Sequence, residues 1–395
     1  MKTYAILGAG MQGTATAYDL ARFAQPARII LADVSLDQAI SSATRVNRLA
    51  ETNSCEAVQV NALAEDSIRP ILESADVVLS CLPYWMHPSV APHAIACGCH
   101  WCDLGGNTQI TWQTLNLDET AAEKGVSIVP DCGLAPGLVN SIGLWLIEHL
   151  DETDTVNLYC GVLPQHPQPP FNYKLTFNVE GLVTEYDYKA IVLRNGEIKE
   201  VDTLAELEEL DIPELGRMEA FTTSGGTSTA PYSLRGIVRN YEYKTIRFPG
   251  HCERMRIFKD FGFWREDAIE VKGVRVAPKD VFNRVFGESL GKITDTDQCV
   301  VRGVGLGRRN GRPVRLQVDL LDRQCEQTGF TSMERLTGCS ISIYAQHLAN
   351  DDAPRGCVRY EKAMTGTQFV EQLERRGISF RFTEEEDVNP IRREG

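Results

Sequence analysis

The sequence predicts an α/β protein. An N-terminal Rossmann domain with a doubly wound parallel sheet precedes a second, α+β domain with a mixed or antiparallel sheet. Up to Pro130, short apolar runs alternate with amphipathic segments, a rhythm typical of parallel strands covered by helices. After Asp131-Cys132-Gly133 the apolar runs lengthen and helical patterns become rare, which is typical of mixed or antiparallel sheets.

Six apolar runs predict the strands of the first domain. Between the first two runs, Ala17, Leu20, Ala21 and Ala24 recur at helical spacing, which predicts an amphipathic helix against the sheet. The six runs cover residues 4–7, 28–32, 57–60, 77–81, 100–104 and 127–130.

The rest of the chain is predicted to form the second domain and a C-terminal region. We assign residues 1–133 to the Rossmann domain, 134–335 to the α+β domain, and 336–395 to helices that return to the Rossmann domain. Helical patterns over residues 332–348 and 365–376 support this return. The strand-like runs after residue 133 cover residues 174–179, 191–194, 242–248, 271–276, 299–305, 314–320 and 378–382.

The composition excludes several classes of partner. The chain has 395 residues, which suits two or three domains, and 40 Lys and Arg against 54 Asp and Glu give a net charge of −14. This charge repels nucleic acids and anionic membranes. We expect a cytoplasmic protein, because the N-terminus shows no signal-peptide pattern and no apolar run has transmembrane length. The 12 cysteines are therefore expected to be reduced thiols.

A glycine motif predicts a dinucleotide site at the start of the first domain. Gly8-Ala9-Gly10-Met11-Gln12-Gly13 follows the first predicted strand and opens a helix, the context in which this motif is typical of cofactor binding. Gly8 is expected to form the tight turn, Gly10 to admit the pyrophosphate, and Gly13 to let helix and strand pack closely. The N–H groups at the helix start, including those of Met11 and Gln12, are expected to bind the anion. An ordinary glycine-rich turn is the alternative.

Asp33, at the end of the second predicted strand, favours NAD over NADP. Its carboxylate lies twenty residues beyond Gly13 and is expected to bind the adenosine ribose and to repel a 2′-phosphate. Val34 is expected beside the ribose. It is not basic, and neither are the two residues after it. An aspartate that caps the next helix is the alternative. Further cofactor contacts are expected where other strands end, at Asn61, Ala62, Cys81, Leu82, Pro83, Gly105 and Gly106.

Several motifs, taken in their order along the chain, resemble the saccharopine dehydrogenase-like family, and most closely its L-lysine 6-dehydrogenase branch. The resemblance extends from residue 1 to about residue 350. Besides the glycine motif, the matching segments are Cys81-Leu82-Pro83-Tyr84, Asp103-Leu104-Gly105-Gly106-Asn107, Asp131-Cys132-Gly133-Leu134-Ala135-Pro136-Gly137, Tyr173-Lys174, Val179-Glu180-Gly181-Leu182, residues 219–228 and residues 242–247.

This resemblance implies an NAD-dependent oxidoreductase that acts on a CH–NH₂ or CH–NH group in amino-acid metabolism. The lysine branch implies lysine degradation by oxidation at the ε-amino carbon, with release of ammonia and of allysine, which cyclises to piperideine-6-carboxylate. Two alternatives stay open. One is a saccharopine or other opine-type dehydrogenase, which needs more cations for its additional carboxylates. The other is a non-catalytic NAD-binding regulator. Exposed sheet edges and the family precedent imply a homodimer or homotetramer.

Four residues near predicted strand ends of the first domain are candidates for the chemistry. Asp103 ends the fifth strand and is our first candidate for binding the amine or acting as the base, with capping of the next turn as the alternative. Asp131 ends the sixth strand and is either a second carboxylate of the site or a cap at the domain hinge. Tyr84 and His87 follow the fourth strand in a loop expected to overhang the nicotinamide, where His87 would titrate near neutral pH. A packing or surface role is the alternative for His87.

The second domain offers candidates for holding the substrate. Tyr173 and Lys174 end a proline-rich loop, where a Lys174 of lowered pKa would supply a proton or bind a carboxylate. An ordinary solvated lysine is the alternative. Arg247 and His251 flank a turn at a strand end, and a planar guanidinium suits a carboxylate.

A hydroxyl-rich loop that contains Thr223, Ser224 and Gly225 is a further candidate for substrate binding. Its backbone N–H groups are expected either to form a nest for the substrate carboxylate or to belong to a plain turn. Cys97-Gly98-Cys99-His100-Trp101-Cys102 carries zinc-type ligands. Because alternate strand residues point to opposite faces, we interpret this segment as a buried strand and predict no metal.

Overall fold

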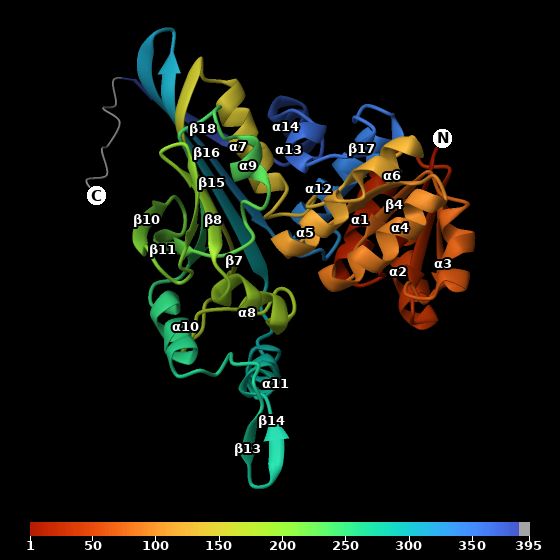
Figure 1. Ribbon diagram of the computed structural model, residues 1–395, viewed down its shortest axis with the longest axis horizontal. Helices are drawn as coiled ribbons and strands as arrows, with labels where there is room; N and C mark the ends of the chain where they lie inside the picture. The colour runs from red at the N-terminus through yellow and green to blue at the C-terminus, as the bar shows by residue number, and fades with distance from the viewer. Residues whose placement is uncertain (387–395) are drawn as a thin grey trace.

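The computed structural model describes residues 1–386, which form two domains and a projecting hairpin (Figure 1). The first domain has a seven-stranded sheet in the order β17-β6-β5-β4-β1-β2-β3, and all neighbours in it are parallel. The strand order reverses beside β1, which is the doubly wound arrangement. The strands are β1 (Thr3–Leu7), β2 (Arg28–Asp33), β3 (Cys55–Gln59), β4 (Val77–Ser80), β5 (His100–Asp103), β6 (Ser127–Val129) and β17 (Gly356–Cys357).

Helices cover both faces of this sheet. Alternate strand residues face opposite sides, so that Ile6 packs in one apolar cluster and Leu7 in another. The helix α12 returns from the C-terminal part of the chain and packs on α1, where a Cβ on Gly338 would lie 2.9 Å from the backbone of Ala15. The helices are α1 (Met11–Phe23), α2 (Leu36–Ala50), α3 (Glu65–Leu72), the 3₁₀ turn η1 (Tyr84–Met86), α4 (His87–Ala96), α5 (Thr108–Leu115), α6 (Asp118–Glu123) and α12 (Ser332–Ala349).

The second domain is built on a mixed nine-stranded sheet. Its main order is β10-β11-β12-β7-β15-β16-β18, with β8 beside β12 and β9 beside β8. Only the β12–β7 pair is parallel among the described pairs of this sheet. The predicted fold class is thus confirmed for both domains. The strands are β7 (Glu152–Pro164), β8 (Ala190–Arg194), β9 (Glu197–Val201), β10 (Glu208–Ile212), β11 (Gly216–Thr222), β12 (Asn240–Arg247), β15 (Asp297–Arg309), β16 (Arg312–Arg323) and β18 (Arg381–Glu386).

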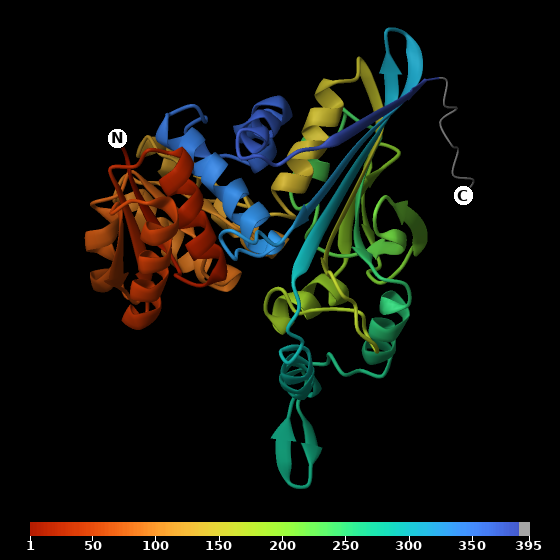
Figure 2. The same cartoon turned by 180° about the vertical axis from the view of Figure 1, so that it is seen from behind.

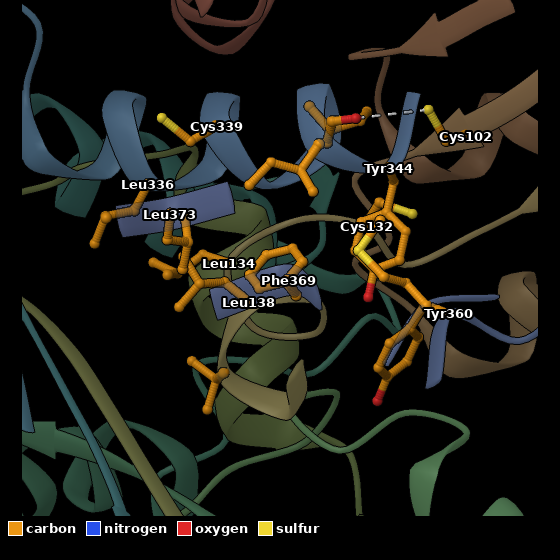
Figure 3. Close-up of a cluster of buried hydrophobic side chains, with 14 of the residues drawn as sticks. Cys102, Cys132, Leu134, Leu138, Leu336, Cys339, Tyr344, Tyr360, Phe369 and Leu373 are labelled. Carbon is orange, nitrogen blue, oxygen red and sulfur yellow. Dashed lines mark hydrogen bonds between the residues drawn. The ribbon is translucent and has the colours of Figure 1, made fainter. Parts of the chain in front are cut away.

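The two domains share an apolar junction (Figure 3). The helix α7 (Leu138–Glu148) lies on the face of the mixed sheet that is turned toward the Rossmann domain (Figure 2). Leu138 of α7, Leu336 and Tyr344 of α12, and Phe369 of α14 (Gly366–Glu374) belong to one buried cluster. Ser141 and Tyr344 reinforce it with a 3.0 Å hydrogen bond between their hydroxyl groups.

Three helices at the far end of the second domain enclose a separate aromatic core. Tyr186, Phe221, Trp264, Phe282 and Phe286 are buried there. The hairpin of β13 (Ile269–Val271) and β14 (Val274–Val276) projects beyond this core in both views (Figures 1 and 2). The helices are α8 (Val179–Asp187), α10 (His251–Asp260) and α11 (Pro278–Leu290). Two further short helices are α9 (Ala230–Ser233) and α13 (Tyr360–Ala363).

Two predicted strands of the second domain were wrong. Residues 174–177 are irregular and α8 begins at Val179, because the Asn178 side chain caps the helix by accepting a bond from the Gly181 N–H at 2.6 Å. Residues 271–276 form a turn and parts of two strands, since Lys272 and Gly273 both have positive φ, the conformation that a two-residue hairpin turn requires.

The C-terminal region does not return to the Rossmann domain as a whole. Although α12 and β17 lie there, β18 pairs antiparallel with β16 in the mixed sheet. The expectation was wrong for this last strand, because the open edge of β16 offers backbone groups that a strand can pair. Residues 387–395 of the expected region lie outside the described residues. Within residues 1–386, no helix combines the length and hydropathy that crossing a membrane requires.

Candidate functional site

The three glycines of the N-terminal motif have different surroundings. Gly8 has φ +97°, and a Cβ there would lie 2.9 Å from the carbonyl oxygen of Cys81. A Cβ on Gly13 would lie 1.8 Å from the carbonyl oxygen of Gly8, whereas a Cβ on Gly10 would meet no atom within 4 Å. Gly8 and Gly13 therefore serve packing and turn geometry, and Gly10 faces open space, as an approaching phosphate requires.

The start of α1 supplies donors for an anion. Gly10 is its N-cap residue and no side chain caps the helix, so that N–H groups of the first turn lack the partner that a capping side chain provides. Met11 is 55% exposed beside them. Such a helix start attracts phosphate through its N–H groups and its dipole, and these residues fit a dinucleotide.

Asp33 holds the glycine loop against the end of β2. Its Oδ2 accepts the Ala9 N–H at 2.8 Å and its Oδ1 accepts the Ser35 N–H at 2.9 Å. The helix-capping role considered for Asp33 belongs to Ser35, whose side chain accepts the Gln38 N–H of α2. Val34 is exposed next to this carboxylate. Asp33 thus keeps a fixed position at the edge where the ribose is expected.

The ends of β3, β4 and β5 complete the edge predicted for the cofactor. Asn61 is exposed and Ala62 is buried after β3. Leu82 is half-buried and Pro83 is exposed after β4. The Tyr84 ring lies so close to Gly106 that a Cβ there would be 3.2 Å from it, and Gly105 and Gly106 both have positive φ. Strands β1, β4 and β5 are parallel neighbours. The residues that follow β4 and β5, including Cys81, therefore lie at the same edge of the sheet.

Asp103 is buried and its oxygens are occupied by groups of the protein. Oδ2 accepts the Trp101 indole N–H at 3.0 Å, and Oδ1 accepts the backbone N–H groups of Gly105 at 2.9 Å and of Asp131 at 3.2 Å. This geometry corresponds to the turn-capping alternative. Asp103 therefore positions the two loops that follow β5 and β6.

His87 does not overhang the site. It is the first residue of α4 and is 2% exposed, since the chain turns through η1 and places it beneath the sheet edge. Its Nδ1 lies 3.7 Å from Oδ1 of Asp103, its Nε2 lies 3.3 Å from the Leu82 carbonyl oxygen, and its ring contacts Trp101 edge-on. The expectation of an overhanging histidine was wrong, and the packing alternative describes its surroundings.

Asp131 connects the two domains. Its Oδ1 accepts the Thr111 hydroxyl at 2.9 Å, and its Oδ2 accepts the Ser228 hydroxyl from the second domain. Burial, together with the charge of Asp103, raises the pKa of Asp131 to about 8. A carboxyl group of this pKa exchanges its proton near neutral pH, which suits a general acid or base.

The hydroxyl-rich loop is held by bonds within the protein. The Ser224 N–H donates to the Glu185 carbonyl oxygen, and the Ser228 N–H donates to the Gly225 carbonyl oxygen. The Thr223 and Thr245 hydroxyls bond at 2.8 Å. Because the Ser224 and Ser228 N–H groups already have partners within the protein, these two groups are not free to form an anion nest.

Arg247 is a buried cation without an acidic partner. It is 4% exposed, its Nε donates to the Tyr186 hydroxyl at 3.1 Å, and its Nη1 donates to a backbone carbonyl. Among the described residues no carboxylate lies within ion-pair distance of it, while its guanidinium carbon lies 5.1 Å from the centre of the Tyr173 ring. An unpaired buried guanidinium is unfavourable in the free protein, which marks it as a site for an anion.

Buried polar groups surround Arg247. The Tyr173 hydroxyl and Nδ1 of His251 lack a well-formed hydrogen bond among the described residues, although the Thr176 side chain and the Phe171 backbone lie near enough to act on their pKa values. Burial and the charge of Arg247 lower the pKa of His251 well below its ordinary value, so that the imidazole is neutral. Burial raises the pKa of Glu185 to about 7, although the charge of Arg247 opposes this.

Glu185 and Tyr186 were not predicted from the sequence. Both lie on α8, and their approach to Arg247 brings together segments that are distant in the sequence, which no local motif indicates. Lys174 donates to the backbone carbonyl oxygen of Asp295.

Within residues 1–386, no group of three or more His, Cys, Asp or Glu side chains is placed to hold a metal ion. Cys99 donates its thiol to the Leu72 carbonyl oxygen at 2.8 Å, whereas the Cys102 thiol lies 4.0 Å from the Ile341 carbonyl oxygen (Figure 3). The two thiols point toward different elements, as expected for a buried strand. All 12 cysteines are free thiols.

Comparisons with known proteins agree with this geometry. The family model "Saccharopine dehydrogenase NADP binding domain" matches residues 4–129, and "Saccharopine dehydrogenase C-terminal domain" matches residues 133–378. The solved apo saccharopine dehydrogenase (L-Glu forming) of Saccharomyces cerevisiae superposes with a TM-score of 0.78 at 17% identity, over 98% of this chain and 100% of that one. This likeness shows a common fold.

Two curated relatives cover different shares of the chain. The mitochondrial alpha-aminoadipic semialdehyde synthase of Rattus norvegicus is 29% identical over 208 residues, which are 50% of this chain and 22% of the rat protein. The saccharopine dehydrogenase [NADP(+), L-glutamate-forming] of Saccharomyces cerevisiae is 22% identical over 275 residues, 65% of this chain and 58% of the yeast protein. The match thus spans less than two thirds of either relative.

Gly10→Ala and Gly13→Ala are expected to separate the two tasks of the glycine motif. A Cβ at position 10 meets no protein atom, but alanine is a poorer N-cap than glycine, so Gly10→Ala should lower the free energy of unfolding by at most about 0.5 kcal/mol and weaken dinucleotide binding by about tenfold or more. Gly13→Ala forces a clash with Gly8 and should lower the free energy of unfolding by roughly 1–3 kcal/mol. Urea unfolding of the free protein and calorimetry with NAD and NADP measure both effects. Equal destabilisation of the two variants would contradict these roles.

Asp131→Asn is expected to flatten the pH dependence of stability. Because the folded-state pKa is about 8 and the ordinary value is 3.8, the folded chain keeps a proton that the unfolded chain releases. The free energy of unfolding should therefore fall as pH rises from about 5 to 8, by up to about 1.4 kcal/mol per pH unit from this group. Above pH 8 this contribution should level off.

Urea unfolding at a series of pH values measures this slope. Asparagine carries no titrating proton; its carbonyl oxygen replaces one carboxylate oxygen as an acceptor, and its N–H₂ group replaces the other and donates to the hydroxyl there. Asp37→Asn, at an exposed position of α2, is the matched control and should keep the wild-type slope. Identical slopes in wild type and Asp131→Asn would refute a protonated buried carboxyl group.

Proposed function

The chain belongs to the saccharopine dehydrogenase family, and from this premise we propose that it is an NAD-dependent oxidoreductase that deaminates L-lysine at the ε-carbon. NAD supplies a hydride acceptor: the C–H pair of electrons passes to it and the nitrogen loses a proton. Water then adds to the resulting imine, and ammonia leaves with formation of allysine, which cyclises to piperideine-6-carboxylate. The residues of the chain bind the cofactor, fix the substrate carboxylate and move the proton.

One observation carries the choice of lysine: the described chain has one buried cation without an acidic partner. Lys244 and Arg302 are also buried, but Lys244 pairs with Glu208 and Arg302 with Asp319. Lysine carries one carboxylate, which Arg247 alone can neutralise. Saccharopine carries three, and each needs a cation or several donors.

The groups around Arg247 are suited to the same carboxylate. The Tyr173 hydroxyl, which has no well-formed hydrogen bond among the described residues, is a donor that a carboxylate oxygen can accept from. The neutral His251 adds no second positive charge. The proposal requires that a lysine whose carboxylate binds Arg247 reach Asp131 with its amine end.

Asp131 is proposed as the acid–base group. A lysine amine must lose its proton before hydride can leave its carbon, and the imine needs a base to activate water. The pKa of about 8 allows Asp131 to take or return a proton at neutral pH. Asp103 supports it by accepting its backbone N–H. Tyr84, above Gly106, is proposed to cover the nicotinamide side of this edge.

The preference for NAD rests on Asp33. Its fixed carboxylate at the end of β2 suits the two ribose hydroxyls and repels a 2′-phosphate. The curated yeast relative is NADP-linked by name, so this preference distinguishes the chain from that relative.

A second candidate function is oxidation of saccharopine. It is favoured by the two family models and by the name of the yeast relative. Both reactions oxidise a C–N bond with a nicotinamide cofactor, and they differ in whether ammonia or an amino acid leaves.

Arg247→Met is expected to raise KM for lysine by roughly 10- to 100-fold, because it removes a charged hydrogen-bond donor to the carboxylate. Arg239→Met, at an exposed arginine before the same strand, is the matched control and should keep the wild-type KM.

Purified wild-type protein with NAD should produce reduced nicotinamide with lysine and not with saccharopine, as measured by the absorbance of the reduced cofactor. Turnover of saccharopine without turnover of lysine would reject the lysine assignment and retain the second candidate.

Asp33→Ser is expected to shift the cofactor preference toward NADP. Removing the carboxylate removes its repulsion of the 2′-phosphate, and the ratio of kcat/KM for NADP to that for NAD should rise by about tenfold or more. Initial rates with both cofactors measure the ratio. Asp37→Ser, an exposed acid four residues further on, should leave it unchanged. A wild-type protein that prefers NADP would contradict the role given to Asp33.

A further inference from the structure

The loop that brings Ser228 to Asp131 is held by a short segment from the C-terminal part of the chain. Residues 359–361, called the clamp below, include the first two residues of α13, which lies between the two domains (Figure 1). Each clamp residue binds a different residue between positions 227 and 233, and Ser228 lies within this range. The bonds join Tyr360 to Thr227, Glu361 to Thr229 and Arg359 to Ser233.

Two of these bonds are buried and lie directly on either side of Ser228. The Tyr360 hydroxyl donates to the Thr227 carbonyl oxygen at 3.1 Å, and the Thr229 hydroxyl donates to Oε2 of Glu361 at 2.9 Å. Tyr360 and Thr229 are 0% exposed, so water does not compete for these bonds. Because a buried polar group that loses its partner is costly, both neighbours of Ser228 are fixed in position.

The bond between Ser228 and Asp131 needs such support, because both residues have an uncommon backbone conformation. Ser228 has φ +42° and Asp131 has φ +67°, values in the left-handed region that residues with side chains adopt less readily than glycine does. Such conformations persist where the surrounding structure holds them. For Ser228, the clamp provides this support through bonds to the residues before and after it.

The clamp also contacts the helix that carries the second hydroxyl donor of Asp131. The guanidinium carbon of Arg359 lies 4.8 Å from the centre of the Trp112 ring, a cation–π contact. Trp112 follows Thr111 in α5, and the Thr111 hydroxyl donates to Oδ1 of Asp131. The clamp is thus linked to both hydroxyl groups that bind Asp131, one from each domain.

We propose that the clamp positions Ser228 for its hydrogen bond to Asp131, so that Tyr360 and Glu361 act as positioning residues for the acid–base group. Hydroxyl donors stabilise the charged form of a carboxyl group. The clamp therefore determines how readily Asp131 releases its proton. The effect on turnover rests on the proposed function, whereas the effect on the protonation of Asp131 does not.

The charged groups around Asp131 fix the direction of the expected effect. Burial and the charges of Asp103 and Glu361 raise the pKa of Asp131, and the bonds from Ser228 and Thr111 oppose this rise. A weaker bond from Ser228 should therefore raise the pKa further. Three tyrosines near these carboxyl groups stay neutral, because burial raises the pKa of each well above its ordinary value; they are Tyr241, Tyr344 and Tyr360.

Tyr360→Phe tests the proposal, because it removes the bond to Thr227 and keeps the ring. Urea unfolding at a series of pH values is measured for each protein with and without Asp131→Asn, and the difference isolates Asp131. Ser228→Ala, which removes the donor, should raise the pH at which this difference levels off by about one pH unit. Tyr360→Phe should raise it by about half as much, since the donor remains but is held less firmly.

Two comparisons separate positioning from general destabilisation. Combined with Ser228→Ala, Tyr360→Phe should have no further effect on the pKa of Asp131, because the donor that it positions is already gone. Tyr344→Phe is the matched control, since this buried hydroxyl bonds to Ser141 and not to the loop. It should lower the free energy of unfolding and leave the pKa of Asp131 unchanged.

An unchanged pKa of Asp131 in Tyr360→Phe would overturn the proposal, as would an equal shift in the Ser228→Ala background. With lysine as substrate, the acidic limb of the pH profile of kcat/KM should move to higher pH in Tyr360→Phe by the same amount. If lysine is not oxidised, the proposed function fails, and the unfolding measurements still decide whether the clamp positions Ser228.

Discussion

The arrangement of the site depends on the burial of one carboxyl group at the domain junction. Asp131 accepts hydroxyl bonds from Thr111 of the Rossmann domain and from Ser228 of the second domain. Removing a carboxyl group from water disfavours its charged form, which raises its pKa to about 8 and makes the neutral, bridging form the stable one near pH 7. The same burial that joins the domains thus prepares this group for proton transfer.

Apolar packing keeps this junction in register. The chain crosses between the domains several times. After the Rossmann strands it enters the second domain, where α7 lies on the mixed sheet. It then returns to the Rossmann sheet with α12 and β17, and its last described strand, β18, pairs in the mixed sheet. Leu138, Leu336 and Phe369 come from these crossings and share one core (Figure 3). Close-packed interiors resist small displacements, so Ser228 is held within reach of Asp131.

The sequence predicted what local patterns determine. The glycine motif and Asp33 lie within one βαβ unit, whose geometry follows from local turn and helix rules, and both occupy the expected places. The surroundings of His87 depend on where α4 begins, and those of Arg247 depend on α8, which is distant in sequence. The spacing of apolar residues along the chain gives no information on contacts between distant segments. The burial of His87 and the contact of Tyr186 with Arg247 could therefore not be predicted. The turn at Lys272-Gly273 was a local signal that the strand prediction overlooked.

The anion site proposed at Arg247 rests on the absence of a carboxylate within ion-pair distance among the described residues, while Glu185 acts on its charge from farther away. A buried charge loses several kcal/mol of hydration that only a partner can restore, and the hydroxyl groups and aromatic rings around Arg247 offset this cost in part. An ion pair with a protein carboxylate would stabilise the free chain but would compete with a substrate. Under the proposed function, the absence of such a pair among the described residues lowers the stability of the free chain and favours a substrate whose single carboxylate replaces the missing partner.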